Sequence, residues 1–214
     1  MIIIFEGMDL AGKGTQVALL KKKLEEEKIP HSAFREAGGT PSAERIRELA
    51  ISSNRPHSPA SRALLFIAAR KELYQEKVIP AIQRGELVIL DRSYPSTFAY
   101  SPEEDWDWIY NVHEGLGLFD LPHKICFFDI DHATHIERIK ERTSKDAIEK
   151  ELTSSQVFNL YRERYLTLFD IQKTNGTVRD VEVISGTGSI ADISMKVLDF
   201  TFGEEHDYQR YTRF

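Results

Sequence analysis

The sequence predicts an α/β fold, with an open parallel sheet that helices cover on both faces. Three observations predict it. Short apolar runs alternate with longer amphipathic segments, the apolar runs are nearly continuous, and a glycine-rich loop joins the first run to the first helical segment. Nearly continuous apolar strands are typical of parallel sheets buried on both faces, and strand–helix alternation builds such sheets.

The predicted strands are the short apolar runs. In chain order they are Ile2–Phe5, the weaker candidate His31–Phe34, Leu87–Leu90, Lys124–Ile130 and Val181–Ile184. Cys126 lies in the fourth of these runs and is expected in the core. Ligands of open α/β sheets bind outside the carboxyl ends of the strands, so we expect the functional site there.

Helical segments lie between the strands. The first follows the glycine-rich loop, where apolar residues recur at helical spacing at Val17, Leu20 and Leu24. Ser58–Pro59 predicts the start of another helix, which Pro80 should kink or break. Later start signals are Thr153 with Gln156, as a capping box, and Ser189 with Asp192.

The chain is expected to form one domain over residues 1–214, because no repeat, low-complexity tract or linker interrupts it. Its formal net charge of −6 argues against a nucleic-acid partner, which needs a basic face, but leaves a small anionic ligand open. The single cysteine allows no disulfide within the chain, so a cytoplasmic (intracellular) location is expected. No apolar run reaches membrane-spanning length, so no membrane partner is expected.

The stretch "IIIFEGMDLAGKGTQ" places a glycine-rich loop directly after a strand and at the start of a helix. Backbone N–H groups at a helix N-terminus bind anions, and glycines let a phosphate approach the backbone. The predicted phosphate-binding residues are Gly7, Leu10, Ala11, Gly12, Lys13, Gly14 and Thr15. The alternative is a turn that only joins the strand to the helix.

The loop departs from the usual phosphate-loop pattern at one position. That pattern has Ser or Thr directly after the lysine, as a ligand of Mg²⁺. Here Gly14 follows Lys13, which would reach the β- and γ-phosphates, and Thr15 is the nearby hydroxyl. Thr15 is therefore expected to act on Mg²⁺ directly or through a water molecule.

The loop alone leaves GTPase, ATPase and kinase activities open, but the chain has no Asn-Lys-x-Asp segment of the kind that reads guanine. Four segments in order resemble the thymidylate kinase family of P-loop enzymes: "FEGMDLAGKGTQ", "FREAGGTPSAERIREL" with Ala37 where the family has proline, "LLFIAARKEL" and "DRSYPSTFAYS". They cover the first half of the chain. The second half matches only in its layout.

The resemblance implies a P-loop NTPase-type three-layer fold with a five-stranded parallel sheet, helices on both faces and a short lid. It implies transfer of a phosphoryl group from ATP to dTMP, which gives dTDP. Mg²⁺ would assist, the partners would be small-molecule nucleotides, and a homodimer is possible.

The resemblance also assigns acceptor-binding roles. Asp9 would bind the 3′-hydroxyl, Arg35 and Arg92 the acceptor phosphate, and Tyr100 would fill the space that a ribose 2′-hydroxyl needs. Phe66 and Arg70 lie four residues apart and share a helix face. Thymine would stack on the ring of Phe66, and a carbonyl of thymine would accept a hydrogen bond from Arg70. Ser96 and Thr97 would bond the edge of the base. The alternatives are a surface ion pair for Arg35, a core position for Phe66 and plain packing for Tyr100.

Asp91 and Arg92 end an apolar strand, where a carboxylate resembles the second acid of phosphate-loop enzymes and would hold Mg²⁺ and its waters. The alternative is an ordinary buried Asp–Arg pair. The predicted metal ligands are thus Thr15 and Asp91, and Lys13, Asp91 and Arg92 are expected to act in catalysis.

A basic lid is expected over about 138–150, with Arg138, Lys140, Arg142, Lys145 and Lys150 as its cations. The family supplies a catalytic arginine from the phosphate loop or from the lid. Here the loop has Leu10 and the lid pair reads Asp146–Ala147. Arg142 and Lys145 are the candidates that remain, and a solvated helix face is the alternative.

Two other functions stay open at this point. One is a kinase for another monophosphate, such as a modified deoxypyrimidine nucleotide or AMP, because adenylate kinases share the spelling "GKGTQ". The other is a catalytically weak nucleotide-binding protein, which Leu10 and Ala147 suggest.

Overall fold

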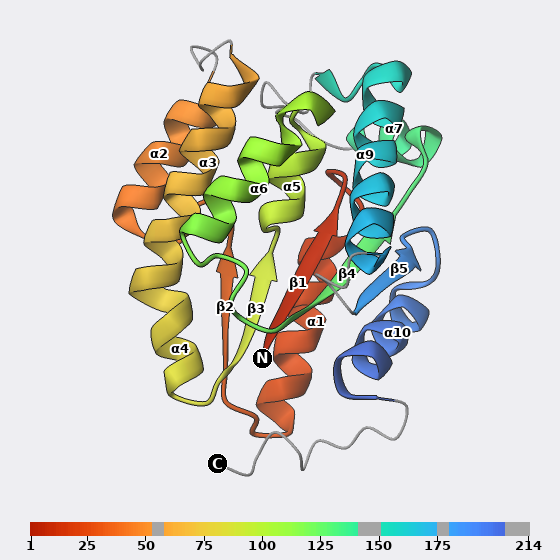
Figure 1. The fold of residues 1–214 in the computed structure, drawn as a ribbon. Coiled ribbons are helices and arrows are strands. Elements are labelled where there is room, and N and C mark those ends of the chain that lie inside the picture. The colour runs from red at the N-terminus through yellow and green to blue at the C-terminus, as the bar shows by residue number, and fades with distance from the viewer. Residues whose placement is uncertain (53–57, 141–150, 175–179, 204–214) are drawn as a thin grey trace.

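The computed structural model describes residues 1–52, 58–140, 151–174 and 180–203 (Figure 1). The helices and strands of these parts are β1 (Ile2–Gly7), α1 (Lys13–Glu26), β2 (His31–Arg35), α2 (Pro41–Ile51), α3 (Pro59–Leu73), the π-helical turn η1 (Tyr74–Val78), α4 (Ile79–Gln83), β3 (Leu87–Asp91), α5 (Tyr94–Ala99), the 3₁₀ turn η2 (Glu103–Asp105), α6 (Trp106–Gly115), β4 (His123–Asp129), α7 (His132–Ile139), α9 (Ser155–Thr174), β5 (Val181–Ser185) and α10 (Ile190–Phe202).

The sheet has five parallel strands in the order β2-β3-β1-β4-β5, with β1 in the centre (Figure 1). All five predicted strands are present. Because the strands are parallel, their carboxyl ends lie along one edge. The ladder register places Phe5 of β1 and Arg35 of β2 on either side of Asp91 of β3. The residues that follow these three strands therefore meet at one edge of the sheet.

Helices cover both faces of the sheet, as the α/β prediction requires. On one face α1 packs against α10, and on the other α3, α5 and α9 form a continuous layer (Figure 1). Helix α2 lies against α3 at the outer side of that layer. Among the described residues, no helix has both the length and the apolar character needed to cross a membrane.

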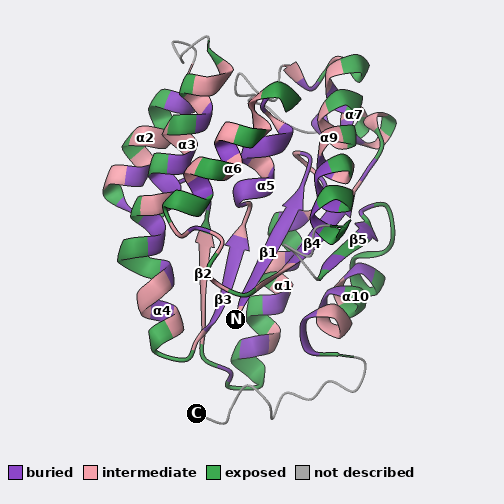
Figure 2. Cartoon of the chain, in the orientation of Figure 1, coloured by how far each residue is buried: buried purple, intermediate pink, exposed green. Residues whose placement is uncertain are grey.

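The core follows the apolar runs of the sequence. Every residue of β1 is buried, as are the middle residues of β3 and β4, whereas the edge strand β2 is only half-buried (Figure 2). Cys126 is fully buried in β4, which confirms its core position, and burial raises the pKa of its thiol. Each fully buried isoleucine contributes about 1.5–3 kcal/mol of transfer free energy.

Two of the predicted helix starts are confirmed and one is displaced. The hydroxyl of Ser58 accepts from the backbone N–H of Ser61, and the hydroxyl of Ser189 caps α10 in the same way. Helix α9 begins at Ser155, so the residue before it is Ser154 and the Thr153 prediction is wrong by one position. Adjacent hydroxyl residues offer two equivalent caps, and the sequence alone does not choose between them.

The interruption expected at Pro80 occurs earlier in the chain. Helix α3 ends at Leu73 and the π-helical turn η1 follows it, so Pro80 lies in the first turn of α4. A proline has no N–H to donate to the carbonyl four residues before it, and its ring clashes with that carbonyl. The wider turn changes the hydrogen-bond spacing ahead of the proline, and α3 and α4 run on as one column (Figure 1).

Candidate active site

The glycine-rich loop leaves the carboxyl end of the central strand and runs into α1. Gly7 has φ 142°, and a Cβ there would lie 2.5 Å from the carbonyl oxygen of Phe128, so this position requires glycine. Gly12, with φ 99°, is the N-cap of α1 and has no side chain to cap it. The first N–H groups of α1 are therefore available to an anion, and the positive end of the helix dipole faces it.

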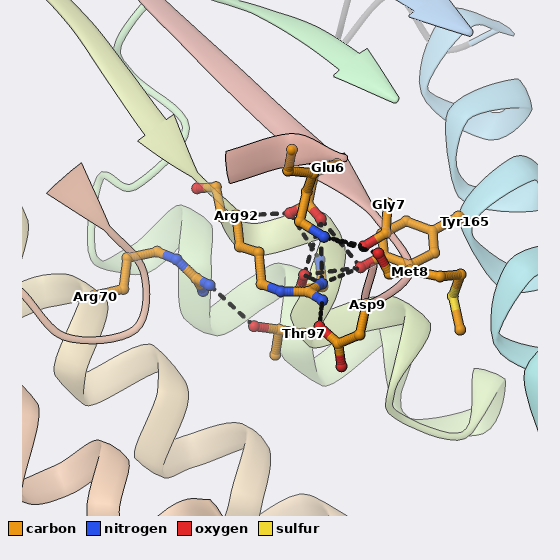
Figure 3. A network of polar contacts seen from close by, with 11 residues as sticks. Glu6, Gly7, Met8, Asp9, Arg70, Arg92, Thr97 and Tyr165 are labelled. Carbon is orange, nitrogen blue, oxygen red and sulfur yellow. Dashed lines mark hydrogen bonds and ion pairs between the residues drawn. The ribbon is translucent and has the colours of Figure 1, made fainter. Parts of the chain in front are cut away.

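The Lys13 side chain folds back over the loop. Its Nζ donates to the carbonyl oxygens of Gly7 at 3.0 Å and Met8 at 2.8 Å (Figure 3). Burial, and then the charge of Arg92, lowers the pKa of this amine to about 8, although nearby carboxylates oppose the shift. An anion bound at the loop would offset this desolvation.

Two hollows open at this edge of the sheet. The larger, which we call the phosphate cleft, encloses about 1930 Å³ of space that is partly open to solvent. It is lined by residues 9–16 of the loop and α1, and by Arg35, Glu36, Arg47, Asp91, Arg92, Arg138, Gly186, Gly188, Ile190 and Ile193. All the predicted phosphate-binding residues except Gly7 line it, and Gly7 sets the start of the loop.

The two predicted metal ligands both line the phosphate cleft. Among the described residues, no hydrogen-bond donor contacts Oδ1 of Asp91, although this oxygen is buried. Thr15 is exposed and presents its hydroxyl on the first turn of α1. A carboxylate and a hydroxyl are the oxygen donors that Mg²⁺ prefers, so this pair fits such an ion.

The smaller hollow, which we call the inner pocket, encloses about 590 Å³ between α2, α3 and α5. It is lined by Asp9, Glu36, Ala37, Arg47, Ile51, Phe66, Arg70, Arg92, Ser93, Ser96, Thr97 and Tyr100. Seven of the eight predicted acceptor-binding residues are in this set. Phe66 is half-buried and lines the pocket, although its ring also packs against a small alanine cluster of Ala37, Ala43 and Ala69.

Arg35, the eighth predicted acceptor residue, lines the phosphate cleft instead. Its Nη2 donates to both carboxylate oxygens of Glu44, at 2.9 and 2.8 Å, and the side chain is half-exposed. The ion pair considered as an alternative is thus present. An exposed pair of this kind contributes little to stability and can exchange partners when an anion arrives.

Arg92 joins the loop to the inner pocket. This residue has φ 73°, and its Nη2 donates to Asp9 while its Nη1 donates to Ser96 at 3.0 Å and Tyr165 at 3.2 Å (Figure 3). Burial opposes its charge, but Asp9 and other neighbours raise its pKa well above the ordinary value. The structure pairs Arg92 with Asp9 of the loop, whereas the alternative considered from the sequence was a pair with Asp91.

Four residues line both hollows: Asp9, Glu36, Arg47 and Arg92. A group passed from a ligand in the cleft to a ligand in the pocket must cross between these side chains. Two of them are arginines and two carry carboxyl groups, so the junction of the two hollows is lined by ionisable side chains of both kinds. Arg47, whose Nη1 donates to the carbonyl of Ala37 at 3.3 Å, was not predicted from the sequence.

A buried carboxylate beneath the loop was also missed. Glu6 is fully buried in β1 and accepts from the backbone N–H of Ser93 at 2.7 Å, from the hydroxyl of Ser96 at 2.9 Å and from the hydroxyl of Tyr165 at 3.0 Å. These bonds tie β1 to α5 and α9 directly below Arg92. Glu6 lies in the segment that resembles the family loop, but nothing local indicates its structural role, because its partners lie far along the chain.

Part of the predicted lid is a fixed helix. Arg138, counted among the lid cations, lies in α7 and donates to the carbonyl oxygens of Leu10 at 2.8 Å and Gly186 at 2.7 Å. His135, one turn earlier, has its Nδ1 3.0 Å from the carbonyl oxygen of Asp9. Helix α7 therefore holds the phosphate loop from outside. The candidates Arg142 and Lys145 lie outside the described residues.

Comparisons with known proteins agree with this architecture. The family model described as thymidylate kinase matches residues 5–183. A thymidylate kinase of Chlorobium chlorochromatii is 34% identical over 180 residues, covering 78% of this chain and 81% of the relative. One of Kosmotoga olearia is 32% identical over 201 residues, covering 92% and 93%. One of Chlorobaculum tepidum is 49% identical over 100 residues, covering 47% of each chain.

The match extends over most of the chain and includes the loop, the inner pocket and the sheet edge that joins them. The expected five-stranded parallel sheet is the one observed. The chain therefore belongs to the thymidylate kinase family.

Proposed function

We propose that this protein transfers the γ-phosphoryl group of ATP to the phosphate of dTMP, which yields ADP and dTDP. The observation that carries the proposal is the junction of two unlike hollows, one polar and built around a phosphate loop, the other small and lined by a ring and buried donors. The names of the relatives support the same reaction.

On the donor side, the N–H groups at the start of α1 and the Nζ of Lys13 bind the β- and γ-phosphates. Asp91 and Thr15 would hold Mg²⁺, which supplies charge neutralisation between the phosphates when bound. Arg138 keeps the loop in position through the carbonyl of Leu10.

On the acceptor side, the inner pocket takes the nucleoside. The thymine ring lies against Phe66, and Arg70 and Thr97 face its edge. Tyr100 occupies the space beside the sugar, which favours a deoxyribose, and Asp9 faces the 3′-hydroxyl. The acceptor phosphate then lies at the junction, within reach of Arg92 and of the half-exposed Arg35.

Transfer needs alignment more than it needs a base. An oxygen of the dTMP phosphate attacks the γ-phosphorus, the bond from that phosphorus to the β–γ bridging oxygen breaks, and ADP leaves with that oxygen. The attacking oxygen is already ionised, so no residue has to remove a proton. Lys13 and Arg92 stabilise the negative charge that spreads over the transferred group. Either Arg142 or Lys145 of the expected lid segment supplies the further positive charge.

The test is a coupled assay of ADP formation with ATP, Mg²⁺ and a panel of nucleoside monophosphates that includes dTMP, dUMP, dCMP and AMP. We expect dTMP to have the highest kcat/KM. Turnover of AMP without turnover of dTMP would contradict the proposal. Binding of ATP without turnover of any acceptor would instead indicate a nucleotide-binding protein with little activity.

A further inference from the structure

The side chain of Arg70 is held at the bottom of the inner pocket by partners from three different segments. Its Nε donates to Glu36 after β2, its Nη2 donates to Oγ1 of Thr97 in α5 at 3.1 Å (Figure 3), and its Nη1 lies 2.8 Å from Nε2 of His113 in α6. Arg70 is 2% exposed and Glu36 1%. The guanidinium is thus fixed in plane and in rotation.

The hydrogen bonds of His113 assign its tautomer. Its Nδ1 lies 2.7 Å from the carbonyl oxygen of Ile109, which can only accept, so Nδ1 carries the hydrogen. The lone pair of Nε2 is then free to accept from Nη1 of Arg70. A protonated ring would instead place an N–H against an N–H of a cation. Burial, and then the charge of Arg70, lowers the pKa of His113 to about 3, which agrees with a neutral ring.

Packing keeps the ring in this orientation. His113 is fully buried and stacks on Phe119 at 5.3 Å between centroids, and the rings of Phe98 and Tyr94 contact it from other sides. The acceptor that meets Arg70 is therefore a rigid one, supplied by a helix that does not line the pocket itself.

We propose that His113 is a positioning residue for acceptor specificity, because its neutral ring fixes Arg70 in the orientation that donates to a base carbonyl. Arginine has five N–H groups, and the contacts above use three. One N–H on Nη1 and one on Nη2 remain for a ligand in the pocket. A pyrimidine with a carbonyl at C4 accepts from such a donor, whereas cytosine presents an amino group there and is rejected.

This inference rests on the proposed function, and the test separates the two. Steady-state kinetics of the wild-type chain with dTMP and dCMP come first, and a wild-type chain that does not use dTMP would contradict the proposed function. The His113 variants are then compared for the KM of dTMP, for kcat and for the ratio of kcat/KM between dTMP and dCMP.

His113→Phe keeps the ring volume but removes the acceptor. We expect the KM of dTMP to rise about tenfold, with a smaller change in kcat, and the preference over dCMP to fall about tenfold, which corresponds to about 1.4 kcal/mol. In His113→Gln the amide oxygen can accept from Nη1 of Arg70. We expect this variant to keep both values within about threefold of the wild type.

His123→Phe is the matched control. His123 is also buried, with Nδ1 2.9 Å from the carbonyl of Leu121 and Nε2 3.2 Å from the hydroxyl of Tyr94, but it does not line the inner pocket. The same substitution there should lower the melting temperature and leave the KM of dTMP unchanged.

Two kinetic results would overturn the inference. One is wild-type KM and wild-type discrimination in a folded His113→Phe variant. The other is equal impairment of the Phe and Gln variants, which would indicate packing alone. A third measurement uses the wild-type chain alone, without substrate. ¹⁵N NMR of the histidine-labelled protein should show Nδ1 of His113 protonated and Nε2 unprotonated. The opposite tautomer would refute the assignment.

Discussion

ATP binding should be linked to proton uptake through Lys13. Burial and the charge of Arg92 together lower the pKa of this amine from 10.5 to about 8, against the opposing effect of Asp9, Asp91 and Glu6. The triphosphate of ATP places several negative charges beside Nζ. The amine is therefore protonated in the complex at pH values where the free protein has begun to lose the proton.

The size of the effect follows from that pKa. At pH 7 the free amine is about nine-tenths protonated, and at pH 9 about one-tenth, so the dissociation constant for ATP should rise roughly tenfold between these two pH values. The complex should take up about half a proton at pH 8 and close to one at pH 9. Affinity falls as the pH rises because the binding-competent, charged form becomes the minor one.

Isothermal titration calorimetry with ATP alone measures both quantities. Titrations at pH 7, 8 and 9, each in two buffers of different ionisation enthalpy, give the dissociation constant and the number of protons taken up. Lys13→Met is the matched control, because it should bind ATP more weakly but without proton uptake. A dissociation constant that stays constant from pH 7 to 9, with no uptake by the wild-type chain, would refute the reasoning.

Further predictions concern the loop and the junction. Gly7→Ala should destabilise the fold by about 3 kcal/mol, because the Cβ of the alanine would meet a backbone carbonyl. Gly14→Ser should raise the melting temperature slightly, because nothing lies within 4 Å of a Cβ at that position. Calorimetric melting checks both. Arg47→Met should lower kcat/KM for dTMP by roughly 10- to 100-fold and leave the affinity for ATP within about twofold, while the exposed Arg45→Met on the same helix should change neither. Arg138→Met should weaken ATP binding about tenfold, because it removes the donor that ties the Leu10 carbonyl of the loop to the Gly186 carbonyl after β5. An unchanged dissociation constant in calorimetry would contradict this.

The sheet could be predicted because strands that are buried on both faces have a local sequence pattern. Each buried strand is a short, nearly continuous apolar run, and even β2, whose residues are only half-buried, keeps enough of the pattern to be found. The sequence pattern indicates the exact path of the helices less clearly. Pro80 indicated an irregularity, but the choice of a wider turn ahead of it depends on how the helix packs on its neighbours.

The site divides in the same way. Asp9, Phe66, Arg70 and Thr97 could be predicted because they fall in segments whose order and spacing resemble a family, and the structure brings all four to one pocket. Residues that act through another side chain could not be predicted from the sequence. Glu6 and its partner Ser96 in α5 are 90 positions apart, and His113 and its partner Arg70 in α3 are 43 positions apart. Only the folded chain brings such pairs together.

Leu10 shows that the shape of the phosphate loop and its catalytic charge are separable. Its φ is 66°, a value that residues other than glycine rarely adopt. This conformation costs about 1 kcal/mol of conformational free energy. The position is nevertheless held by the bond from Arg138 to the Leu10 carbonyl and by the contact of His135 with the preceding one. These contacts engage the backbone, so they hold the loop whatever side chain stands at position 10. In the proposed mechanism, leucine in place of an arginine at this position would remove a charge without altering the shape of the loop, and the catalytic cation would then come from another segment.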